Sequence, residues 1–229
     1  MRLFTVLLLA AFTLTLLTSA LAQPPRGGPR PGGSSDFEKE LIPKSEGEKR
    51  ILDTLQEMWQ GGERFRNVSP SDGRLLRMFA EVANAQRVVE IGTSTGESAL
   101  WLAIALQSTG GHLYTHEIDP GRAEIARKNF EKAGVSKIVT IIEGDAHENV
   151  SQHSEPIDIL FLDADKEGYI DYLSKLLPLV KPGGLVIAHN MNTRQADARF
   201  VKAITEDKNL ETLILLKEGT GVGVTLKKR

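Results

Sequence analysis

From Arg87 onward the chain alternates between short apolar runs and amphipathic helical patterns. The apolar runs are typical of buried strands and lie at residues 87–92, 112–119, 137–144, 157–164 and 183–190. Between them, residues follow a helical period at 97–106, 120–133 and 169–180. Strand patterns that alternate with helical patterns indicate βαβ units, so we predict a parallel sheet with helices on both faces.

The two ends of this region follow other patterns. Residues 210–217 and 221–228 are strand-like and separated by a Gly-Thr-Gly turn, which predicts an antiparallel hairpin. Upstream, apolar residues at helical spacing from Ile51 to Trp59 predict a helix that ends at Gly61-Gly62. A second helix is expected after Ser71. The residues on its expected apolar side are Leu75, Leu76, Phe79 and Val82.

The first 35 residues differ from the rest in composition. Arg2 is followed by an uncharged, leucine-rich stretch and by Ala20-Leu21-Ala22, the three-part pattern of a secretory signal. We therefore expect a signal peptide at 1–22, a Pro/Gly/Ser-rich linker at 23–35 and a folded domain at 36–229. The expected location is periplasmic or secreted; an uncleaved membrane anchor is the alternative.

The overall composition excludes several classes of site. The 229 residues include no cysteine, which rules out disulfides, thiolate metal sites and cysteine nucleophiles. A net charge of −2 gives no reason to expect nucleic acid or an anionic membrane as a partner. The expected partner is a small molecule, and a homodimer through the helix around Ile51 to Trp59 stays open.

A glycine-rich turn follows the first predicted strand. It reads Glu90-Ile91-Gly92-Thr93-Ser94-Thr95-Gly96 and passes directly into a helix. Dinucleotide-binding turns use G-x-G-x-x-G to bind a pyrophosphate, whereas this spacing is G-x-x-x-G. The acid two residues before Gly92 suits a cationic ligand that carries an amino acid. An NAD-dependent oxidoreductase is therefore disfavoured.

Acidic residues also follow the next two predicted strands. Glu117 ends the second strand, where an acid can accept hydrogen bonds from both hydroxyls of a ribose. The segment Glu143 to His147 ends the third strand and is placed to meet an adenine. Three such strand ends in order favour a site for S-adenosylmethionine (SAM).

Together with Phe161-Leu162-Asp163-Ala164-Asp165-Lys166, these segments resemble a known enzyme family. It comprises the small divalent-metal O-methyltransferases, which include catechol and caffeoyl-CoA O-methyltransferases. The resemblance runs from about Asn67 to the C-terminus. It implies an α/β class I methyltransferase fold with a Rossmann-like, seven-stranded sheet, and methyl transfer from SAM to a hydroxyl of a small, catechol-like acceptor. The residues that it places around SAM are Val68, Glu90, Gly92, Thr93, Ser98, Glu117, Ala146 and Asp165.

The same resemblance places a divalent metal on Asp163, His189 and Asn190, and a proton acceptor on Lys166. The family's usual pair at the last two ligands is Asp-Asn, and here it is His-Asn. Imidazole suits Mn²⁺ and other transition metals better than Mg²⁺. The metal is therefore expected to be different, weakly held or lost. An exported binding protein that keeps the fold without catalysis is the alternative function.

Overall fold

The computed structural model describes residues 41–61, 68–215 and 221–229. Pro43–Arg229 form one compact unit. The expected signal peptide and linker, and the first residues of the expected domain, lie outside the described residues, so those boundaries stay predictions. Among the described helices, none has both the length and the apolar character needed to cross a membrane.

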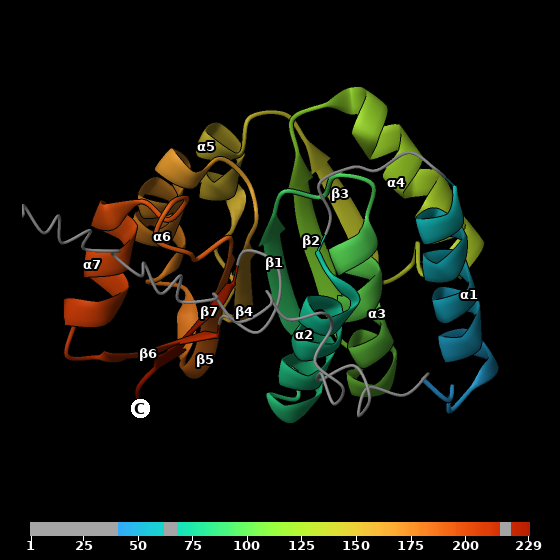
Figure 1. Cartoon of the computed structure of the whole chain (residues 1–229), viewed down its shortest axis with the longest axis horizontal. Helices are drawn as coiled ribbons and strands as arrows, with labels where there is room; N and C mark the ends of the chain where they lie inside the picture. Colours follow the sequence, from blue (N-terminus) through green and yellow to red (C-terminus); the bar gives the residue numbers. More distant parts are fainter. Residues whose placement is uncertain (1–40, 62–67, 216–220) are drawn as a thin grey trace, which may run out of the picture. The chain divides into compact units, whose positions relative to one another are not determined.

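The centre of the domain is a seven-stranded sheet (Figure 1). In the order in which they pair, the strands are β3 (Val139–Glu143), β2 (His112–Glu117), β1 (Arg87–Ile91), β4 (Ile157–Leu162), β5 (Val180–His189), β7 (Val222–Lys227) and β6 (Leu210–Leu215). Strands β1 to β5 pair in parallel, and β7 runs antiparallel to both of its neighbours. The predicted fold class and terminal hairpin are confirmed.

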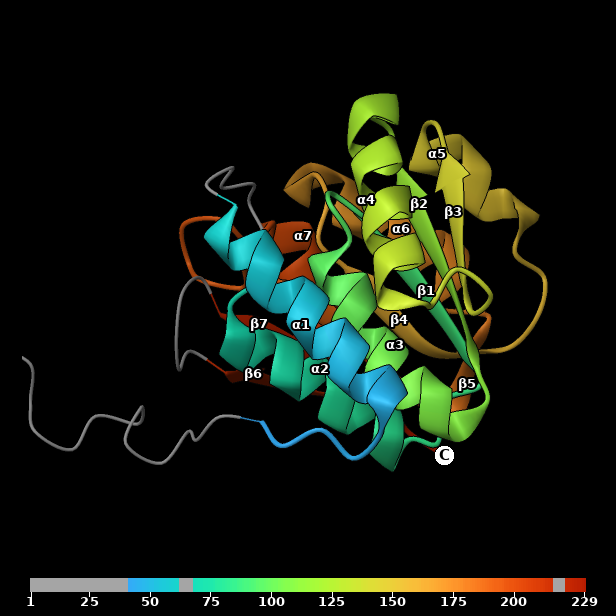
Figure 2. The same cartoon turned by 90° about the vertical axis from the view of Figure 1, so that its right-hand side faces the viewer.

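Helices cover both faces of the sheet, as Figures 1 and 2 show. One face carries α1 (Glu46–Gln60), α2 (Pro70–Val82), α3 (Glu97–Thr109) and α4 (Pro120–Ala133). The other carries α5 (Ala146–Asn149), α6 (Tyr169–Leu176) and α7 (Ala198–Glu206). Because α1 and α2 both pack on α3, every residue of α3 from Glu97 to Leu106 is buried. Strand β4 is likewise buried along its whole length.

The apolar face of α1 is used within the chain. Ile51 and Leu55 are fully buried where α1 packs against α3 and α4. Trp59 stays partly exposed and stacks at 6.3 Å on the buried ring of Trp101. A homodimer through this helix would use its remaining surface, and it stays a prediction.

Helix α2 differs from its prediction in where it begins and in which residues of its apolar side are buried. It begins at Pro70, and its cap is Ser69 rather than Ser71, since the Ser69 hydroxyl accepts a hydrogen bond from Asp72 N. Val82 is 84% exposed, whereas Gly73 is buried. A Cβ on Gly73 would lie 2.1 Å from Trp101 Nε1, so this glycine is what lets α2 approach α3. The packed face therefore includes the predicted Leu76, which is buried, together with Gly73, which hydrophobicity does not mark.

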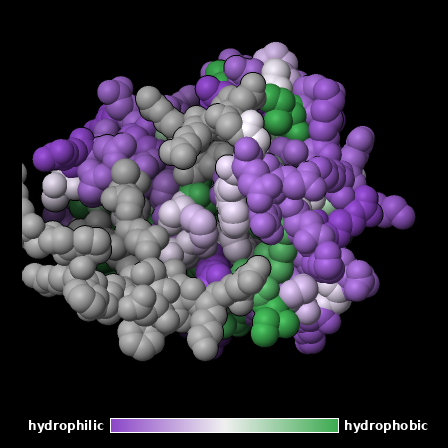
Figure 3. All heavy atoms as spheres, turned by 45° about the vertical axis from the view of Figure 1, so that its right-hand side comes forward, coloured by the Kyte–Doolittle hydropathy of each residue, from purple (hydrophilic) through white to green (hydrophobic). Residues whose placement is uncertain are grey.

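Two further differences lie near the C-terminus. The helix predicted at 169–180 ends at Leu176, because Pro178 cannot continue it and Val180 already pairs with Ile157 in the sheet. Helix α7 was not predicted. It is capped by Asp197 and buries Phe200 and Ile204. The coloured surface in Figure 3 is mostly hydrophilic, with hydrophobic residues in a few separate groups.

Candidate functional site

A cavity of about 1340 Å³ opens at the carboxyl ends of the parallel strands. Ligands of open α/β sheets bind at this edge, because successive strands deliver their last residues and loops to it. The predicted residues that line the cavity are Gly92, Glu117, Ala146, Asp163, Asp165, Lys166, His189 and Asn190. The other four predicted residues, Val68, Glu90, Thr93 and Ser98, do not line it and are buried.

Glu90 lies fully buried at the end of β1. The Ser98 hydroxyl donates to its Oε1, while Oε2 has no hydrogen-bond partner among the described residues. Burial raises the pKa of Glu90 to about 7, against the opposing effect of the hydrogen bond from Ser98. A buried carboxylate with an unused acceptor atom suits a cationic group such as an ammonium.

The loop after β1 is held in a conformation that favours glycine. Gly92 has a φ of 106° and Gly96 a φ of 92°. The backbone N–H groups of Gly92 and Thr93 donate to the carbonyl of His116 in β2. A Cβ on Gly92 would lie 2.4 Å from the Asp163 carbonyl oxygen. This glycine therefore allows the loops after β1 and β4 to touch.

Replacing Gly92 by alanine is expected to lower stability by roughly 1–3 kcal/mol through backbone strain, with a further loss from the displaced Asp163 backbone. Gly110→Ala is the matched control, because Gly110 also has a positive φ (76°) but no atom within 4 Å of its Cβ position. Thermal unfolding measures both. If Gly92→Ala and Gly110→Ala lower the stability equally, the close approach of the new Cβ to the Asp163 carbonyl has no cost of its own.

Glu117 is fixed between two loops. Its Oε2 accepts from Ser94 N at 2.7 Å, and its Oε1 accepts from Asp119 N at 3.0 Å. Each carboxylate oxygen has a second acceptor site, so both remain able to accept from a ribose hydroxyl. The carboxylate is thus held in place at the cavity wall, and each of its oxygens can still accept one more hydrogen bond.

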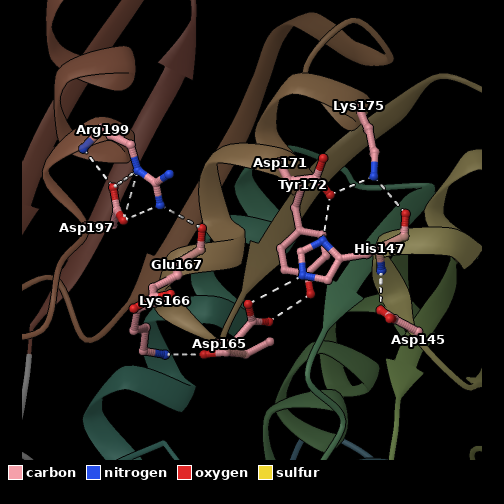
Figure 4. A network of polar contacts seen from close by, with 11 residues as sticks. Asp145, His147, Asp165, Lys166, Glu167, Asp171, Tyr172, Lys175, Asp197 and Arg199 are labelled. Atoms are coloured by element: carbon pink, nitrogen blue, oxygen red, sulfur yellow. Dashed lines mark hydrogen bonds and ion pairs between the residues drawn. The ribbon is translucent and has the colours of Figure 1, made fainter.

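A network of polar and aromatic side chains forms the wall beside Ala146 (Figure 4). The ring of His147 stacks on Tyr172, with centroids 4.5 Å apart, and its Nδ1 lies 2.6 Å from Asp171. The hydroxyl of Tyr172 donates to Asp165 Oδ1 at 2.8 Å. The hydrogen bond to Asp171 raises the pKa of His147. The sequence placed His147 in the segment expected near the adenine, but it gave no role to Tyr172, because only the packing of α6 beside α5 brings the two rings together.

Lys166 lies within the group of side chains around Asp163. Its Nζ donates to Asp163 Oδ1 at 3.0 Å, to the Ala164 carbonyl at 2.9 Å and to the Tyr169 hydroxyl at 2.8 Å. Burial raises the pKa of Tyr169 well above its usual value, so this hydroxyl stays protonated. Lys166 is therefore a positioned, partly buried amine.

His189 bridges two carboxylates. Its Nδ1 lies 3.0 Å from Asp163 Oδ2, and its Nε2 lies 3.2 Å from Asp72 Oδ2. Burial alone lowers the pKa of His189, but the hydrogen bonds and charges of Asp163 and Asp72 outweigh it and raise the pKa to about 9. Asp72 is a site residue that sequence reasoning missed. It lies 117 positions before His189, and its local pattern is that of an ordinary first-turn acid of a helix.

The predicted metal ligands lie close together, but protein side chains already contact two of them, Asp163 and His189. Asp163 and His189 contact each other, and Asn190, with a φ of 60°, lines the same cavity. In the part of the chain that is described, no group of three or more His, Cys, Asp or Glu side chains has a metal-binding arrangement. Both carboxylate oxygens of Asp163 and both ring nitrogens of His189 already face protein partners. This donor set does not suit a divalent cation.

Comparisons with known proteins agree with this architecture. The chain is 36% identical over 145 residues to a catechol O-methyltransferase of Niastella koreensis and 35% over 125 residues to one of Mycobacterium tuberculosis. These matches cover 62% and 54% of this chain, and 65% and 56% of the relatives. The chain thus spans less than two thirds of either relative.

Solved structures with the same fold include an O-methyltransferase from Bacillus cereus in complex with SAH. It matches with a TM-score of 0.70 and 28% identity, over 85% of this chain and 95% of the other. A putative O-methyltransferase from Klebsiella pneumoniae matches with a TM-score of 0.69 and 28% identity, over 86% and 96%. Residues 43–228 match the O-methyltransferase family, which is nearly the whole described chain, and the protein belongs to that family.

Proposed function

We propose that the protein is a SAM-dependent O-methyltransferase that acts on a hydroxyl of a small, catechol-like acceptor. The observation that carries the proposal is one cavity lined both by the fixed carboxylate of Glu117 and by the amine of Lys166 beside Asp163. Glu90, two residues before the lining residue Gly92, is buried and adds a carboxylate with an unused oxygen. The names of the catechol O-methyltransferase relatives support the acceptor class.

SAM would lie along the carboxyl edge of the sheet. Glu117 would accept from its ribose hydroxyls, and the buried carboxylate of Glu90 would attract its ammonium group. Ala146 and the His147–Tyr172 pair would flank the adenine. These contacts orient the sulfonium so that its methyl group faces the acceptor oxygen, because transfer proceeds by in-line displacement.

The acceptor hydroxyl would lie against Lys166. Lys166, in its neutral form, takes the proton while an oxygen lone pair forms the bond to the methyl carbon. The carbon–sulfur bond breaks, its electron pair stays on sulfur, and SAH leaves. Asp163 holds the Lys166 amine in place through Oδ1. Residues of this chain therefore supply binding, orientation and proton transfer.

A binding protein that keeps the fold without catalysis is the second candidate. It is favoured by the contacts of Lys166, whose three hydrogen-bond partners are all protein oxygens. Calorimetry with SAM, followed by an assay on a panel of catechols, separates the two functions. SAM binding without any methylated product would favour the binding protein.

Replacing Glu117 by alanine is expected to weaken SAM binding by roughly 1.5–3 kcal/mol, the worth of hydrogen bonds to a charged group. Glu143→Ala is the control, because Glu143 also ends a strand at this edge but does not line the cavity. Calorimetry measures both affinities, and thermal unfolding verifies folding. Unchanged affinity in a folded Glu117→Ala variant would mean that the ribose lies elsewhere.

A further inference from the structure

The contacts of His189 involve both of its ring nitrogens. Each ring nitrogen faces a carboxylate oxygen, Asp163 Oδ2 at 3.0 Å and Asp72 Oδ2 at 3.2 Å. A cation bound to either ring nitrogen would have to separate that nitrogen from its carboxylate partner. Both nitrogens of His189 are therefore already engaged within the protein.

Asp163 is engaged on its other side as well. Its Oδ1 accepts from Lys166 at 3.0 Å, and its side chain is 14% exposed. The side chain of His189 is 8% exposed and that of Asp72 is 12% exposed. Two carboxylates therefore alternate with two basic side chains in a largely buried row, Asp72–His189–Asp163–Lys166. Both carboxylates of the row are already paired with basic side chains of the protein.

We propose that His189 replaces the divalent cation of this site: its ring joins Asp72 to Asp163, and the site binds neither Mg²⁺ nor Mn²⁺. An aspartate at 189 would put two adjacent carboxylates and Asn190 around an ion. Histidine at this position instead places a ring between Asp72 and Asp163, so that the two carboxylates are joined by a protein side chain.

This inference deepens the proposed function and, for its substrate, rests on it. A metal ion selects acceptors with two adjacent oxygens, because both oxygens chelate it. Without an ion, the acceptor oxygen is oriented by protein side chains such as Lys166 and His189, which line the cavity, and a second oxygen on the acceptor is not required. Acceptors with a single phenolic hydroxyl are then methylated as well as catechols.

The first test measures metal binding and needs no activity. Mg²⁺ and Mn²⁺ are titrated by calorimetry into the wild-type protein and into H189D and H189N, each with SAH present. We expect a Kd above roughly 1 mM for the wild type and for H189N, and at least about tenfold tighter binding for H189D. Thermal unfolding should show a shift with Mg²⁺ for H189D alone, because an ion that binds the folded state stabilises it.

Two outcomes would overturn the inference. Stoichiometric Mn²⁺ binding by the wild type at micromolar concentration would mean that Asp72 holds the Nε2 hydrogen while Nδ1 binds the ion, the usual carboxylate–histidine–metal arrangement. A folded H189D that binds neither ion would mean that something other than His189 excludes the cation.

The second test uses turnover with catechol and with a phenol that has one hydroxyl, each with and without EDTA. We expect EDTA to change neither rate by more than about twofold, the ordinary scatter of such a comparison. Loss of turnover with EDTA and its return with Mn²⁺ would contradict the inference. Absence of any turnover would count against the proposed function instead, and the metal titrations would still decide the role of His189.

Discussion

Replacing Lys166 by alanine is expected to lower kcat by roughly 10²–10⁴-fold, the usual contribution of a positioned proton acceptor. SAM affinity should stay unchanged, because the contacts of Lys166 are with Asp163, Ala164 and Tyr169 rather than with the residues proposed to bind SAM. Steady-state kinetics on a catechol and calorimetry with SAM measure the two quantities separately.

Arginine at the same position tests the chemical role. Lys166→Arg keeps the positive charge, but its guanidinium does not release a proton in the relevant pH range. It should therefore be as slow as Lys166→Ala. A Lys166→Arg variant with nearly normal kcat would show that the charge is needed and proton acceptance is not. Lys202→Ala, on the exposed surface of α7, is the control for loss of a lysine.

Replacing Glu90 by glutamine is expected to have opposite effects on SAM binding and on stability. SAM affinity should fall by roughly 1.5–3 kcal/mol, because the ammonium loses a charged acceptor. In the SAM-free protein, the variant should be more stable than the wild type at pH 8, since it no longer buries a carboxylate that lacks a partner for Oε2. Calorimetry and thermal unfolding measure the two effects.

The stability of the protein and its affinity for SAM should both depend on pH, because burial raises the pKa of Glu90 from 4.5 to about 7. Between these values the folded protein binds more protons than the unfolded chain, so stability falls as the pH rises through this window. Each pKa unit is worth about 1.4 kcal/mol, which gives a loss of roughly 3 kcal/mol from this group. SAM affinity should rise over the same window and level off above pH 7, because the ammonium prefers the ionised carboxylate.

Glu90→Gln should remove both of these pH dependences. Glu143→Gln is the control, since Glu143 is a strand-end glutamate whose side chain is 44% exposed. Equal pH profiles for the wild type and for Glu90→Gln would show that another group binds the ammonium.

The sequence by itself determined the fold and the edge at which the site lies. Buried parallel strands appear as apolar runs, and the residues that follow such strands must meet at one edge of the sheet. That rule placed Gly92 and Glu117 at one edge of the sheet, and the family resemblance added Asp163 and His189. All four residues line one cavity. The antiparallel hairpin at the C-terminus was also predicted correctly, because turn residues and the alternation of apolar and polar residues are local signals in the sequence.

The tertiary structure alone decided what these residues contact. Asp72 reaches His189 only because Gly73 lets α2 pack closely on Trp101, a contact that no periodicity encodes. The pairing of His147 with Tyr172 likewise depends on how α5 and α6 pack on the same face of the sheet. Local sequence patterns specify which segments form helices and strands and where the strands end. Which residues far apart in the chain become hydrogen-bond partners depends on how side chains of different volume pack where helices meet. The predicted metal ligand His189 therefore became, in the folded protein, a bridge between two carboxylates.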